Sequence, residues 1–68
     1  MKLDIEQLEF YRMSLMLNQG ELAQKADISQ ATLSTLKNRG TCSKATLKKI
    51  ARALEVDPTE LLLKAKEG

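Results

Sequence analysis

The sequence contains no histidine or tryptophan, and its 68 residues include one cysteine, one proline, one tyrosine and one phenylalanine. Without histidine, the lone thiol of Cys42 cannot form a zinc site of Cys and His ligands, so no metal is expected. A single cysteine also excludes an internal disulfide framework and is typical of proteins in a reducing compartment. No apolar run approaches the ~20 residues that a membrane-spanning helix needs.

The same shortages argue against catalysis. There is no histidine to act as a general base, no glycine-rich phosphate loop and no recognisable pair of pocket carboxylates. The sequence therefore predicts neither an enzyme nor a bound cofactor. Because Asp4 interrupts the start of the chain and no apolar segment follows, no signal peptide is predicted, and we expect a cytoplasmic protein without membrane contact.

Strand signals are weak, since apolar and polar residues never alternate over a sustained stretch. Helical spacing of apolar residues and typical N-cap residues predict five helices instead. The helices are expected at about 4–16, after Asn18, after Ser29, from Ser43 to about Leu54, and after Asp57 through leucines 61–63. The last of them is expected to fray at residues 66–68. The short connections predict an all-α fold, one compact five-helix bundle over residues 1–68.

The first predicted helix has more apolar surface than a small monomer needs. The stripe expected to face inward consists of Ile5, Leu8, Tyr11 and Leu15. A second strip beside it consists of Phe10, Met13 and Leu17. Two interpretations remain open, a helix sandwiched between other helices or a subunit interface.

Residues 18–38 have the pattern of two short helices joined by a tight turn. Asn18 and Glu21 have the spacing of a capping box at the start of the first helix. The small Ala23 is placed where two crossing helices approach closely, and only residues 27–29 remain for the turn. This is the outline of a helix-turn-helix, a motif whose second helix enters the major groove of DNA.

The net charge of +2 conceals an uneven distribution. Residues 29–54 contain six Lys or Arg and no Asp or Glu, whereas the segments on both sides carry more acids than bases. A charge run is often only a solvated face, but this one begins with the second helix of the motif. We therefore expect a surface that faces a polyanion.

The chain resembles the phage repressor/Cro-type helix-turn-helix family, also called the xenobiotic-response-element type. The matching pieces, in order, are Gln19 with Glu21-Leu22-Ala23, then residues 28–34, then residues 49–54, then Asp57-Pro58. The resemblance implies a lambda-repressor-like domain whose helices 2 and 3 form the motif. It also implies sequence-specific binding of double-stranded DNA, a role in transcription, and a homodimer on a palindromic operator.

Four features depart from the family pattern, three residues and the length of one loop. Asp27 and Met16 stand where glycine is frequent, and Asp27 is expected to tolerate a left-handed conformation. Arg12 matches a family arginine, but Lys37 replaces the glutamate that usually pairs with it. We therefore expect this ion pair to be lost and both cations to face phosphate. The loop 38–43 is about one residue shorter than is common in the family.

The inward-facing leucines of the second motif helix leave its other face for DNA. The expected base contacts are Gln30, Ala31, Ser34 and Thr35. The expected phosphate contacts are Gln19, Lys37, Asn38, Arg39, Thr41 and Lys44. The resemblance also implies that Gln19 braces Gln30. Lys48, Lys49 and Arg52 are expected to project into solvent and to contribute only to the positive electrostatic field around the protein.

These observations favour a homodimeric transcription regulator, expected to be a repressor, with dimer contacts from the fifth helix and the loop before it. Two alternatives stay open. One is an antitoxin-type or other protein-interaction module that binds a partner through the apolar strip and uses its helix-turn-helix for autoregulation. The other is a helical scaffold without DNA binding. No sensing domain is recognisable, so no small-molecule ligand is expected.

Overall fold

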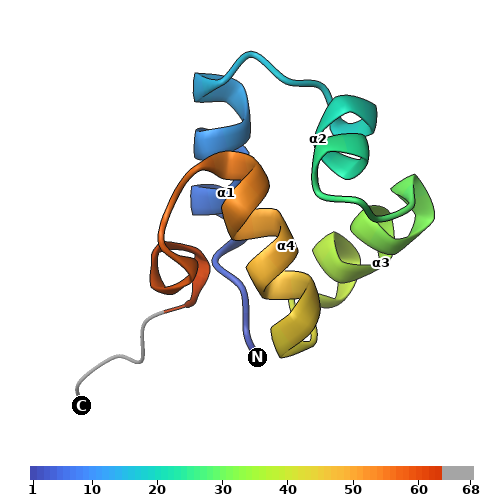
Figure 1. The fold of residues 1–68 in the computed structure, drawn as a ribbon. Helices are drawn as coiled ribbons and strands as arrows, with labels where there is room; N and C mark the ends of the chain where they lie inside the picture. Colours follow the sequence, from blue (N-terminus) through green and yellow to red (C-terminus); the bar gives the residue numbers. More distant parts are fainter. Residues whose placement is uncertain (64–68) are drawn as a thin grey trace.

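The computed structural model describes residues 1–63 and contains four α-helices followed by a short 3₁₀ helix (Figure 1). The α-helices are α1 (Ile5–Ser14), α2 (Gln19–Lys25), α3 (Gln30–Arg39) and α4 (Lys44–Leu54). The 3₁₀ helix, η1, spans Pro58–Leu61. Within these residues, no helix has the length and apolarity needed to cross a membrane.

Each α-helix begins where a side chain caps it. At α2, Asn18 Oδ1 accepts from the Glu21 amide at 2.7 Å, and Glu21 Oε1 accepts from the Asn18 amide at 2.8 Å, so the predicted capping box is confirmed. The side chains of Asp4, Ser29 and Ser43 cap the other three helices, and each accepts a hydrogen bond from the backbone amide three residues ahead. The helix starts are therefore set locally, by groups that satisfy otherwise free backbone amides.

The fifth predicted helix is not an α-helix. After four residues of η1 the chain becomes extended at Leu62, which forms an isolated bridge with Leu3. Leu61 O accepts from the Asp4 amide at 2.9 Å, and the Leu63 amide donates to Lys2 O at 3.0 Å. These bonds to the start of the chain compete with helix continuation, so the five-helix prediction is corrected to four α-helices and a 3₁₀ helix. The fraying expected at residues 66–68 lies outside the described residues.

Every helix contributes to one core. The largest fully buried side chains are Leu8, Leu22, Leu33, Ile50, Leu54 and Leu61. They come from α1, α2, α3, α4 and η1, and α4 lies between α1 and α3 (Figure 1). Burying each such leucine or isoleucine contributes about 1.5–3 kcal/mol to the stability of the fold. Because buried residues of α4 share this core with those of α2 and α3, α4 fixes the position of the α2–α3 pair.

The two apolar strips predicted for α1 are only partly confirmed. In the inward stripe, Leu8 is buried and Ile5 and Tyr11 pack partly against the core, but Leu15 follows the end of α1 and is 36% exposed, so its predicted inward position is wrong. In the second strip, Leu17 packs partly against the core. In contrast, Phe10 is 60% exposed and Met13 is 65% exposed. A helix covered on both sides is therefore the wrong interpretation for Phe10 and Met13, and the interface interpretation stays a prediction.

Within residues 1–63, three non-glycine residues just beyond helix ends have a positive φ. They are Met16 (φ 57°), Asp27 (φ 60°) and Glu55 (φ 61°). Beyond Asp27 the chain turns sharply, because the Ile28 amide donates to Ala23 O at 2.9 Å. The expected tolerance of Asp27 is confirmed, and Met16 adopts the same conformation where the family often has glycine. Each such residue costs about 1 kcal/mol relative to a right-handed conformation.

Candidate nucleic-acid interface

The α2–α3 pair is a close-packed unit. The buried residues of this unit are Leu22 and Ala23 on α2, Ala26 directly after α2, and Leu33 and Leu36 on α3. Ala23 is only 2% exposed, as expected for a small residue where two helices approach closely. The turn residue Ile28 is half-buried against the same cluster. This packing fixes the angle at which α3 presents its other face.

The exposed face of α3 carries the residues predicted to contact bases. Gln30, Ala31, Ser34 and Thr35 are all exposed. Thr32 is exposed as well, but its hydroxyl accepts from the Ser29 hydroxyl at 2.8 Å and its amide donates to Ser29 Oγ. Thr32 therefore belongs to the helix cap, and the first two turns of α3 keep four side chains free for a partner.

The side chain of Gln30 lies against the first turn of α2. A Cβ atom added to Gly20 would come within 2.5 Å of Gln30 Nε2. Among the described residues no hydrogen bond joins Gln19 to Gln30, so bracing by Gln19 is not present. Gly20 makes the room for Gln30 instead. Sequence reasoning missed Gly20, although a glycine at the second position of a helix is an unusual signal.

Most of the predicted phosphate contacts lie around the loop of residues 40–43 between α3 and α4. Asn38 and Arg39 are exposed at the end of α3, Thr41 in the loop and Lys44 at the start of α4, and Gln19 is exposed at the start of α2. The extended start of the chain holds this loop in place. Leu3 N donates to Gly40 O at 2.8 Å, and Cys42 N donates to Met1 O at 3.0 Å. The geometry of the loop thus depends on residues 1–3.

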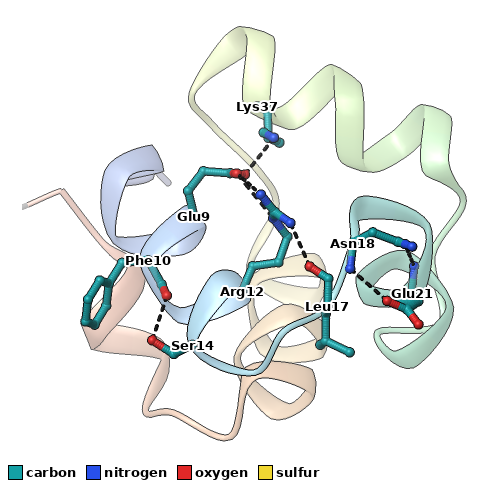
Figure 2. Close-up of polar contacts among 8 residues, drawn as sticks. All are labelled: Glu9, Phe10, Arg12, Ser14, Leu17, Asn18, Glu21 and Lys37. Carbon is teal, nitrogen blue, oxygen red and sulfur yellow. Dashed lines mark hydrogen bonds and ion pairs between the residues drawn. The ribbon is translucent and has the colours of Figure 1, made fainter.

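Lys37 lies elsewhere than expected. Its ammonium is 2.6 Å from Glu9 Oε1, and its side chain is only 18% exposed. Arg12 binds the other oxygen of Glu9 and also donates to Leu17 O at 2.6 Å (Figure 2). The expectation that Arg12 and Lys37 are unpaired and face phosphate is therefore wrong. Arg12 is paired with Glu9 on α1 instead of with the family glutamate that Lys37 replaces on α3. This Glu9–Arg12–Lys37 cluster links α1 to α3.

The cluster holds Glu9 in its charged form. The hydrogen bond from Arg12 lowers the pKa of Glu9 below its usual value, and Lys37 acts in the same direction. Partial burial opposes them and raises the pKa, but the lowering contributions outweigh it. The carboxylate therefore stays ionised between two cations at neutral pH.

A shallow hollow of about 280 Å³ lies beside the exposed face of α3. It is lined by Ala31, Thr32, Thr35, Leu36, Thr41, Cys42 and Thr46. Burial raises the pKa of the Cys42 thiol, which disfavours the reactive thiolate. The methyl and hydroxyl groups around the hollow are suited to contacts with thymine methyl groups and sugar edges.

Comparison with known proteins agrees with this geometry. Residues 12–63 match the model of the Cro/C1-type HTH DNA-binding domain, and the chain belongs to this family. The family match supports a DNA-binding role for the α2–α3 motif, and such domains are typically not enzymes. Comparison with curated protein sequences gives no significant match.

Two solved structures share the fold. They are native PhpD with cadmium atoms and a point mutant of hydroxyethylphosphonate dioxygenase. Each superposes with a TM-score of 0.80 at 22% identity over 98% of this chain. The chain spans only 15% of either structure's length. At this identity the likeness shows the fold alone.

Proposed function

We propose that residues 1–68 form a single domain that regulates transcription by binding double-stranded DNA sequence-specifically. In this proposal α3 lies in the major groove, and two copies of the lambda-repressor-like domain bind a palindromic operator as a repressor. One observation carries the proposal. The polar and methyl groups of Gln30, Ala31, Ser34 and Thr35, which have no side-chain hydrogen-bond partner within residues 1–63, form the exposed front of α3. Two exposed cations flank it, Arg39 at the end of α3 and Lys44 at the start of α4.

The chemistry of these side chains suits base edges. An amide such as that of Gln30 can pair with adenine N6 and N7, and a methyl such as that of Ala31 can contact a thymine methyl. Ser34 and Thr35 lie one turn further along α3, where a hydroxyl can donate to or accept from either base. Sequence preference is therefore assigned to the first two turns of α3.

Contacts to the DNA backbone are assigned to the residues around α3. The proposed set is Gln19, Asn38, Arg39, Thr41 and Lys44. Lys37 is left out because its ammonium is occupied by Glu9 at 2.6 Å. These contacts set the register of α3 without carrying sequence information. Arg39 and Lys44 are the two cations among them.

Selection from a pool of random duplexes tests the proposal. We expect enrichment of one palindromic sequence and a complex whose mass corresponds to two chains per duplex. With two cations on phosphate in each copy, log affinity should fall against log salt with a slope of about −2 per copy. Absence of any enriched sequence would exclude the proposal, and a single chain per selected duplex would exclude the homodimer.

Gly20→Ala is expected to relax sequence preference while the domain stays folded. The added methyl would fall 2.5 Å from Gln30 Nε2 and so displace the amide, whereas alanine is the better helix former. The preferred duplex and one altered at the base pair assigned to Gln30 should then bind with similar affinity, and the melting temperature should not fall. Gln24→Ala, an exposed change on the same helix, is the control and should retain the preference.

A second candidate function is a protein-interaction module of the antitoxin type. The exposure of Phe10 and Met13 on α1 favours it, because solvated large apolar side chains often mark partner surfaces. Co-expression with the product of a neighbouring reading frame tests it. The candidate requires a complex that Met13→Ser weakens without loss of duplex binding.

A further inference from the structure

A second hollow, of about 270 Å³, lies between the C-terminal end of α2 and the outer face of α4. It is lined by Lys25, Ala26, Asp27, Lys48, Lys49 and Arg52. Four of these six residues are cations and one is an acid. It shares no residue with the hollow beside α3.

The positive charge of this hollow is only partly neutralised. Lys25 Nζ lies 3.2 Å from a Glu55 carboxylate oxygen, and Asp27 is on the rim. Lys48, Lys49 and Arg52 form no ion pair within residues 1–63. With Glu55 and Asp27 both counted, an excess of two positive charges remains. Cations held together repel each other, and a bound anion would relieve that repulsion.

The hollow is separate from the proposed DNA contacts. Gln19 begins α2 and Lys25 ends it, so the two lie about 9 Å apart along the helix axis. Likewise Lys44 begins α4, and Arg52 lies near its end, about 12 Å further along. The cationic hollow thus lies at the C-terminal end of α2, whereas Gln19 is at the N-terminal end, and its α4 residues lie beyond the first turn of that helix. A duplex seated on α3 leaves it open.

We propose that this hollow is a second anion site, which binds a small molecule carrying two or three linked phosphate groups. The ammonium groups of Lys48 and Lys49, which form no ion pair within residues 1–63, offer charge-assisted donors, and the guanidinium of Arg52 can bind two phosphate oxygens at once. No aromatic side chain is among its lining residues. The site therefore recognises phosphate and offers no stacking surface for a base.

Titration with inorganic triphosphate at low ionic strength, followed by calorimetry, tests this site. We expect saturable binding of one anion per chain. Lys49→Gln and Arg52→Gln should each weaken binding about tenfold, since each removes a charge-assisted contact. Lys2→Gln removes the same charge from an exposed position outside the hollow, and it should change the affinity by no more than about twofold.

Two outcomes would overturn the proposal. Equal weakening by all three variants would mean that the affinity for triphosphate depends only on the net charge of the protein and not on the hollow. Release of triphosphate when the selected duplex saturates the protein would place the hollow inside the DNA interface. The titration and the comparison of variants are independent of the proposed function, because a chain that binds no DNA can still bind triphosphate in the hollow, and only the competition with the duplex depends on it.

Discussion

Glu9→Gln is expected to lower the melting temperature by roughly 10 °C. The substitution keeps the shape of the side chain but removes the charge that Arg12 and Lys37 share, and both cations are mostly buried. Leaving them without a carboxylate should cost about 2 kcal/mol, and 1 kcal/mol shifts the melting temperature of a domain this small by roughly 4–8 °C. Thermal unfolding followed by circular dichroism measures the effect.

Glu6→Gln is the matched control, since Glu6 is an exposed acid on the same helix and should change stability little. The effect of Glu9 should also depend on pH. Its pKa is lowered in the folded state, so the stabilisation is fully present above the unfolded carboxyl pKa of about 4.3. It is lost as pH falls through the lower, folded value. Equal destabilisation by both substitutions, at all pH values, would contradict the assigned role of the cluster.

Gln30→Ala and Lys44→Ala are expected to damage DNA binding in different ways. Gln30→Ala should cost about 1–3 kcal/mol at one base pair and so relax preference there. Lys44→Ala should weaken all duplexes alike and reduce the salt slope by about 1. Binding to the selected duplex and to its single-base variants, at several salt concentrations, separates the two effects.

Each of these variants serves as the control for the other. A change of preference at one base pair in Lys44→Ala would show that the start of α4 reads bases. A uniform loss of affinity in Gln30→Ala would show that Gln30 binds the backbone. Both side chains are exposed, so neither substitution should disturb the core, and the melting temperature checks this.

The parts of the fold that depend on near neighbours could be predicted from the sequence. The caps at Asn18, Ser29 and Ser43 act on amides three residues ahead, so the pattern alone locates them. The exposed face of α3 followed from the spacing of Leu33 and Leu36, which must be buried together. Local chemistry determines these features.

The rest depends on contacts between distant segments. Glu9 and Arg12 are visible as a pair on one helix, but nothing in the sequence places Lys37 of α3 beside them. The end of η1 depends on pairing of residues 61–63 with residues 2–4, and helical propensity contains no information on such pairing. Gly20 was missed because its importance depends on the position of the Gln30 side chain in space.

The extended start of the chain has a consequence for the order in which the domain opens. Residues 1–3 pair with residues 40–42, and residues 2–4 pair with residues 61–63. Contacts so distant in sequence form late in folding. The α2–α3 pair, by contrast, is a short hairpin of helices with local contacts. A chain whose ends detach would therefore retain its helices but lose the ordered 40–42 loop. On heating, binding to DNA would therefore be lost at a lower temperature than helix content. The residues that must stay folded for binding thus extend beyond the helix-turn-helix and include the extended start of the chain.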